Sequence, residues 1–252
     1  MPNNADKPTV LFSSGLGGAA AFWAPQLEAF EKRFRVVTYD QRGTGPDRSS
    51  RLPDGYSIAD MADEAAALLD RLGIASCHFV GHALGGAIGL EFAHRHSQRL
   101  QRLVVINGWG QIDSHTQRCF EARAALLKHC GVAAYVRAQA IFLYSAAWAS
   151  ANAERLAAED EKGVANFQGA DNLRTRLTAL RTWNASDYLT TIQAEVLALA
   201  AKDDVLVPWT ASQLLADRLP RGRLSLLAEG GHACTVTNPD ASNTALLVFL
   251  AA

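Results

Sequence analysis

The residues of this chain best suited to chemistry are a glycine-rich turn, an acidic pair and a histidine, in that order along the sequence. The turn, residues 81–86 with the sequence GHALGG, has the pattern of a nucleophile elbow. Such an elbow joins a buried strand to a helix and lifts a serine, cysteine or aspartate at its apex. Ala83 occupies that apex, and a methyl group cannot attack a substrate. The sequence therefore predicts an elbow that lacks its nucleophile.

Two later residues could activate a water molecule instead. His232, in the segment GGHAC at 230–234, could accept a proton on one ring nitrogen. A carboxylate at the other nitrogen would fix the tautomer and stabilise the charged ring. Asp204 is the expected acid, and Asp203 is the competing carboxylate. Cys234 is an alternative nucleophile, disfavoured because the elbow is the position aimed at the histidine.

A second glycine-rich turn, SSGLGG at 13–18, follows the first predicted strand. Glycines let backbone amides approach a ligand closely. Paired amides from such a loop and from the residue after an elbow apex form an oxyanion hole. Leu16 and Leu84 are therefore expected to donate through their backbone N–H groups. A tight glycine turn without a ligand is the alternative.

These segments need elements that bring them to one edge of a sheet. Short apolar runs alternate with helical patterns, which is typical of a parallel sheet covered on both faces. The predicted strands cover 10–13, 36–39, 77–80, 103–107, 196–200 and 224–228. The predicted helices cover 27–32, 58–72, 87–94, 209–219 and 238–250.

Residues 112–188 interrupt this alternation with a helical pattern rich in Ala, Leu, Arg and Glu. An insertion between the fourth and fifth predicted strands would stand above the carboxyl ends of the strands, where open α/β sheets bind ligands. We predict a helical cap at 112–188 over a pocket, with 1–111 and 189–252 forming the core. A separate structural helical domain is the alternative.

Four further residues are candidates for substrate contact. Asn107 and Trp109 end a strand under the predicted cap, where a polar group and an aromatic wall could line a pocket. Arg118, in the cap, could hold the carboxylate of a small anionic substrate, although an arginine on a solvated helix face is the simpler interpretation. His82 precedes the apex and has either a packing role or a direct one.

Composition and charge exclude several classes of function. A chain of 252 residues suits one large domain with an insertion. Its net charge of -1 and dispersed basic residues offer no stripe for nucleic acid. There is no apolar run of membrane-spanning length and no signal-peptide pattern after Met1. Four scattered cysteines argue against a zinc site or a disulfide framework. We expect a cytoplasmic protein with a small-molecule substrate and no metal or cofactor; a homodimer formed through the cap or a sheet edge stays open.

Taken together, these motifs resemble the α/β-hydrolase superfamily from end to end. In that superfamily the nucleophile position, the acid and the histidine follow one another in this chain order. The resemblance implies an α/β-hydrolase fold, with a mostly parallel central sheet flanked by helices and a helical cap inserted after the sixth strand. It rests on GLGG at 15–18, YDQRGTG at 39–45, the elbow, DVLVP at 204–208, and GH at 231–232.

Four strings resemble the RutD family of hydrolases, which belongs to the Rut pathway of pyrimidine degradation. They are VINGW at 105–109, HTQRCF at 115–120, NFQG at 166–169 and GGHAC at 230–234. This resemblance implies hydrolysis of carbamate to ammonia and bicarbonate during uracil breakdown. Hydrolysis of aminoacrylate to malonic semialdehyde and ammonia is the alternative that it implies. Alanine at the elbow also occurs within this family.

The missing serine limits the chemistry that the site can do. Removing a triad nucleophile costs about a millionfold in a serine protease, and the oxyanion hole and binding leave roughly 10³ to 10⁴ over water. Such a residual acceleration is sufficient only for a substrate that already decays in water. We therefore expect His232, oriented by Asp204, to deprotonate a water beside Ala83 that attacks a labile C–N compound. A non-catalytic binding protein on this fold and an engineered serine-to-alanine variant are the alternatives.

Overall fold

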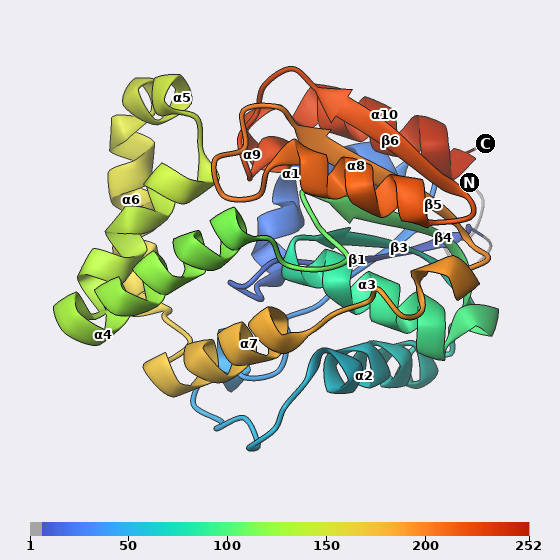
Figure 1. Ribbon diagram of the computed structural model, residues 1–252, viewed down its shortest axis with the longest axis horizontal. Coiled ribbons are helices and arrows are strands. Elements are labelled where there is room, and N and C mark those ends of the chain that lie inside the picture. Colours follow the sequence, from blue (N-terminus) through green and yellow to red (C-terminus); the bar gives the residue numbers. More distant parts are fainter. Residues whose placement is uncertain (1–6, 252) are drawn as a thin grey trace.

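The computed structural model describes residues 7–251. Six strands within this range form one sheet (Figure 1). The strand order is β2-β1-β3-β4-β5-β6, and every neighbouring pair is parallel. All six predicted strands are present, with ends shifted by a few residues. Their bounds are Thr9–Ser13 (β1), Arg35–Thr38 (β2), Cys77–His82 (β3), Leu100–Ile106 (β4), Glu195–Ala201 (β5) and Gly222–Leu227 (β6).

Helices cover both faces of the sheet, as the alternating pattern predicts. The side chains of α2, α3 and α8 pack in one apolar cluster, and those of α1 and α10 pack in another on the opposite face. Every residue of the inner strands β1 and β3 is buried. The edge strand β2 is only partly buried, because it has a neighbouring strand on one side only. The helix bounds are Ala24–Glu31 (α1), Ile58–Arg71 (α2), Leu84–Arg95 (α3), Trp209–Arg218 (α8), Cys234–Thr237 (α9) and Pro239–Ala251 (α10).

Four helices lie between β4 and β5, where the sequence indicates a helical insertion. In Figure 1, α4, α5 and α6 group at the left end of the sheet, and α7 lies below it. Gly131, with φ of 85°, interrupts α4 and kinks it. The domain limits of 112 and 188 stay predictions. The helices are Ser114–Leu143 (α4), Ala146–Ala151 (α5), Ala153–Ala165 (α6) and Ala170–Thr182 (α7).

The insertion lies between the fourth and fifth strands, as the strand pattern predicts, and the place after a sixth strand that the resemblance implies is wrong for this sheet. The described chain before the insertion supplies only β1 to β4 to the sheet. The carboxyl end of β4 still opens at the same edge as those of β1 and β3, since all three are parallel. The change in strand count therefore leaves the insertion beside the turn that follows β3.

Among residues 7–251, none of the helices combines the length and the apolar character needed to span a bilayer.

Candidate active site

The turn from β3 into α3 has the strained geometry of a nucleophile elbow. Ala83 has φ of 50° and ψ of -109°, a conformation that side-chain-bearing residues rarely adopt. The glycines around it are required by close backbone approach. A Cβ added to Gly81 would lie 2.1 Å from the carbonyl oxygen of Gly85, and one added to Gly85 would lie 2.0 Å from that of Ser13. The elbow is therefore built as in a hydrolase, with a methyl group at its apex.

The expected acid and base meet in a buried pair. Nδ1–H of His232 donates to Oδ2 of Asp204 over 2.7 Å, and both side chains are almost fully buried. The other oxygen, Oδ1, accepts from the backbone N–H groups of Leu206 (2.8 Å) and Val207 (2.9 Å). These bonds hold the carboxylate in one orientation and leave Nε2 of His232 as the imidazole's free nitrogen.

The two competing groups from the sequence have other roles. Asp203 accepts from the N–H groups of Gly230 (3.2 Å) and Gly231 (2.8 Å), so it shapes the loop before the histidine. Cys234 is fully buried, and burial raises the pKa of its thiol to about 12. Because the thiolate is the nucleophilic form of cysteine, the Cys234 alternative is wrong.

Asn107 was expected to contact the substrate, and the structure places it behind the histidine instead. Its Nδ2 donates to the carbonyl oxygens of Gly231 (3.2 Å) and His232 (2.7 Å), while its Oδ1 accepts from the N–H of Ala201 (3.0 Å). With its amide fully used, Asn107 fixes the histidine loop to the end of β5. It does not border the cavity that the histidine faces.

His82 holds the same carbonyl group from the other side. Its Nε2–H donates to the carbonyl oxygen of His232 over 2.7 Å, which leaves Nδ1 as a buried acceptor with no partner among the described residues. Burial, and then the nearby charge of His232, lower the pKa of His82 to about 3. The ring is therefore neutral, and it forms part of the cavity wall against Phe22, 4.8 Å between ring centroids.

The cavity at this edge has a volume of about 550 Å³ and is bordered by Ala83 and His232. Leu16 and Leu84 border it too, and neither backbone N–H donates to another described residue. The carbonyl oxygen of Leu16 accepts from Nε2 of Gln168 over 3.0 Å, so the insertion anchors the first glycine turn. The free amides lie where the sequence predicts an oxyanion hole, and their role in catalysis stays a prediction.

Two more of the predicted substrate contacts lie outside this cavity. Trp109 is buried behind the cavity, with its ring 6.1 Å from that of Phe120, which does line it. Arg118 is exposed and lies outside the cavity. The arginine that lines the cavity is Arg123, which is 5% exposed.

A helical pattern in the sequence could have found Arg123. The buried residues in the first half of α4 recur every three or four positions, as one face of a helix requires. Arg123 belongs to that series and Arg118 does not. The series is Thr116, Phe120, Arg123 and Leu127.

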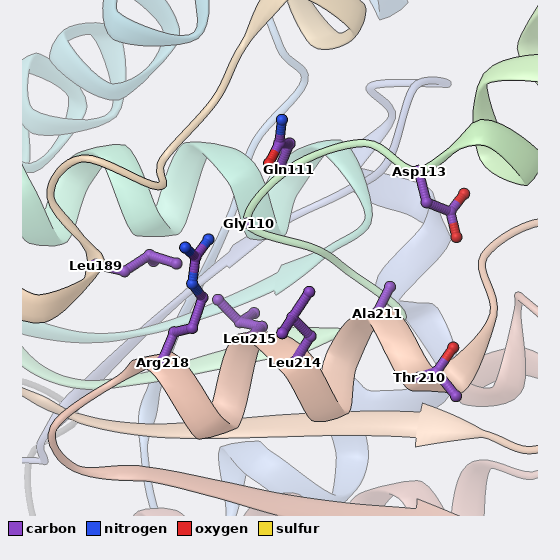
Figure 2. A pocket seen from close by; sticks show the side chains of 9 residues that line it. All are labelled: Gly110, Gln111, Asp113, Leu189, Thr210, Ala211, Leu214, Leu215 and Arg218. Atoms are coloured by element: carbon purple, nitrogen blue, oxygen red, sulfur yellow. The ribbon is translucent and has the colours of Figure 1, made fainter.

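A second, smaller cavity lies between α8 and the loop after β4 (Figure 2). Its volume is about 240 Å³, and its wall includes Leu189, Leu215 and Arg218. No histidine or cysteine lines it. Nor does any group of three His, Cys, Asp or Glu side chains in the described part of the chain form a candidate metal site. The paired acid and histidine border the cavity at Ala83 and not this one.

Comparison with known proteins agrees with this geometry. Residues 8–239 match the family model described as the alpha/beta hydrolase fold. The chain belongs to the alpha/beta hydrolase fold family.

Within the family, similar sequences include RutD proteins. A relative from Pantoea ananatis is 52% identical over 98% of this chain and 90% of its own, and one from Agrobacterium fabrum is 49% identical over 98% and 94%. Both are named "Putative carbamate hydrolase RutD". Among solved structures, the enol-lactonase from Burkholderia xenovorans aligns with a TM-score of 0.87 at 25% identity, covering 98% of this chain and 92% of its own.

Proposed function

We propose that this protein is a hydrolase of pyrimidine breakdown in the Rut pathway and that it hydrolyses carbamate to ammonia and bicarbonate without a covalent intermediate. The names of the relatives support the substrate. The observation that carries the mechanism is the buried His232–Asp204 pair, which borders the same cavity as an elbow with alanine at its apex. This arrangement retains a general base and lacks the group that a covalent pathway needs.

In the proposed reaction, the proton on Nδ1 of His232 stays on the ring and is donated in a hydrogen bond to Asp204, so Nε2 takes a proton from a water beside Ala83. The water oxygen forms a bond to the carbamate carbon. The N–H groups of Leu16 and Leu84 stabilise the oxygen that gains negative charge. The C–N bond then breaks, and the imidazolium returns its proton to the leaving nitrogen. The balance is H₂N–COO⁻ plus H₂O giving NH₃ plus HCO₃⁻.

The expected acceleration suits a labile substrate. General acid–base catalysis contributes about 10² to 10⁴, and an oxyanion-hole donor contributes about 10² to 10³. These factors suffice for a compound that decays unaided in water, and they are too small for a peptide or a simple amide. The alanine at position 83 therefore selects for substrates whose uncatalysed hydrolysis is already fast.

Aminoacrylate is the second candidate, and the size of the cavity favours it. A volume of about 550 Å³ is many times larger than carbamate, one of the smallest organic anions. In this reaction the enamine tautomerises to an imine, and the water activated by His232 adds to the imine carbon. Ammonia then leaves, and malonic semialdehyde is formed. The balance is H₂N–CH=CH–COO⁻ plus H₂O giving OHC–CH₂–COO⁻ plus NH₃.

The test is ammonia release from freshly prepared carbamate and, separately, from aminoacrylate, each compared with decay in buffer. We expect wild-type protein to accelerate carbamate decay and His232→Ala to lose about 10² to 10⁴ of that acceleration. His129→Ala, which removes an exposed histidine, is the matched control and should act as wild type. Carbamate decay no faster than in buffer would refute the carbamate proposal. Acceleration of aminoacrylate alone would establish the second candidate.

A further inference from the structure

The cavity that His232 borders is also lined by a buried arginine of the insertion. Arg123 is 5% exposed and borders the cavity. Its Nη2 donates to the hydroxyl of Tyr135 (3.3 Å) and to Oε1 of Gln139, and its Nε has no partner among the described residues. No described carboxylate lies within 4.0 Å of the guanidinium. The buried guanidinium of Arg123 thus has no ion-pair partner among the described residues.

Three aromatic rings partly stabilise the positive charge of Arg123 in place of a carboxylate. The guanidinium carbon of Arg123 lies 5.6 Å from the ring centre of Phe120, 5.8 Å from that of Tyr135 and 5.7 Å from that of Phe142. Such rings attract a cation through their quadrupole, more weakly than a carboxylate would. Burying a charge that lacks an ionic partner is costly. An anion entering the cavity would therefore gain more at Arg123 than at a solvated arginine.

Of the other charged groups near the cavity, Glu159 has partners and Arg176 lies outside the cavity wall. Glu159 borders it, and its Oε1 accepts from Nε of Arg155 (2.8 Å) while its Oε2 accepts from the hydroxyl of Tyr144 (3.1 Å). Arg176, the other buried arginine, is outside the cavity wall and donates through Nη2 to Gln41. Arg123 is therefore the buried cation that a ligand in the cavity can reach.

We propose that Arg123 forms a carboxylate-binding subsite at the insertion end of the cavity, apart from the reacting centre at Ala83. Guanidinium groups recognise carboxylates through paired N–H donors, which gives orientation as well as affinity. The ligands are small organic monocarboxylates whose carboxylate lies away from the carbon that reacts. The proposed subsite rests on the proposed function in one respect, the position of the reacting centre at Ala83. Binding at the subsite does not require turnover.

The first test uses wild-type full-length protein and two unreactive probes, propionate and propionamide, in isothermal titration calorimetry. The two probes have nearly the same shape and differ in charge. We expect propionate to bind at least about tenfold more tightly, since a hydrogen-bonded charge pair is stronger than a neutral one. Equal affinity for the acid and the amide would overturn the subsite.

The second test locates the preference. Arg123→Gln should remove the preference for propionate, and Arg123→Lys should retain part of it because the charge remains. Arg118→Gln removes an exposed arginine on the same helix and should leave the preference unchanged. A preference that persists in folded Arg123→Gln would place the anion elsewhere and refute the proposal. If that variant does not fold, judged by its thermal transition, the wild-type comparison still decides.

The outcome is independent of the carbamate assay. A protein that turns over carbamate and binds propionate and propionamide equally would keep the proposed function and lose the subsite. A protein that favours propionate through Arg123 and releases ammonia no faster than buffer would keep the subsite and lose the function.

Discussion

The substitution Asp204→Asn tests the proton transfer directly, because the surroundings of this side chain determine how an amide would sit. Oδ1 of Asp204 accepts from two buried backbone N–H groups, and Oδ2 accepts from Nδ1–H of His232. An asparagine can place its single oxygen on only one of these sides. Its NH₂ group must then face either the two backbone donors or the histidine ring.

The hydrogen bonds decide between the two orientations. Turning the NH₂ toward the N–H groups of Leu206 and Val207 would leave two buried donors unsatisfied, at about 1 to 3 kcal/mol each. The NH₂ therefore faces Nδ1 of His232, the ring proton moves to Nε2, and Nε2 can no longer accept a proton from water. A penalty of about 2 kcal/mol leaves the useful tautomer in about one molecule in thirty.

We accordingly expect Asp204→Asn to lower kcat at least about thirtyfold, up to the 10² to 10⁴ that a general base contributes, with KM little changed. The assay is ammonia release from fresh carbamate after subtraction of the rate in buffer. Asp187→Asn, which changes an exposed aspartate outside the site in the same way, is the matched control, and its kcat should stay close to wild type. An Asp204→Asn variant as fast as wild type would refute the assigned role of the pair.

Two further predictions follow from the elbow and from its neighbour. Ala83→Ser places a hydroxyl at the strained apex, beside the same cavity as His232, so we expect this variant to hydrolyse p-nitrophenyl acetate with an acyl-enzyme burst. The burst should be absent when His232→Ala is added. A folded serine variant without esterase activity would contradict the inferred alignment of the apex with His232. Burial lowers the pKa of His82 from 6.5 to about 3, so the unfolded chain takes up this proton first and the folded state loses stability as pH falls from about 6.5 toward 3. The decline in Tm over that range, measured by scanning calorimetry, should be shallower in His82→Gln, and an unchanged slope would show that His82 does not contribute.

The parts of the site that sequence predicts well depend on short-range constraints. Gly81 and Gly85 mark positions where backbone segments approach too closely for a side chain, and such a requirement is visible as a glycine pattern. The strands and the helices at 58–71 and 209–218 follow from apolar periodicity within a few residues. Their alternation also predicts a parallel sheet, because parallel strands need a crossover between them.

Side-chain direction is harder to predict, because it depends on which segments cross. Asn107 ends a strand where a polar group could face a ligand, yet its amide turns toward the loop of His232, which lies far away in the sequence. Trp109 faces Phe120 from behind the cavity wall for the same kind of reason. Arg118 and Arg123 occupy different faces of one helix, and the face that meets the core follows from how α4 docks on the rest of the chain.

By itself, the sequence determined that a hydrolase elbow without a nucleophile precedes an acid and a histidine in a parallel α/β fold. Each of those features is formed by residues that are close together in the sequence, so a sequence pattern is enough to identify it. Only the tertiary structure decided that Asp204, and not Asp203, binds His232, and that Arg123 is the cation within the cavity. Hydrogen bonds between distant segments and the packing of α4 decide which aspartate and which arginine are used. The residues of each pair have the same chemistry, and they differ in the direction of their side chains in the folded chain.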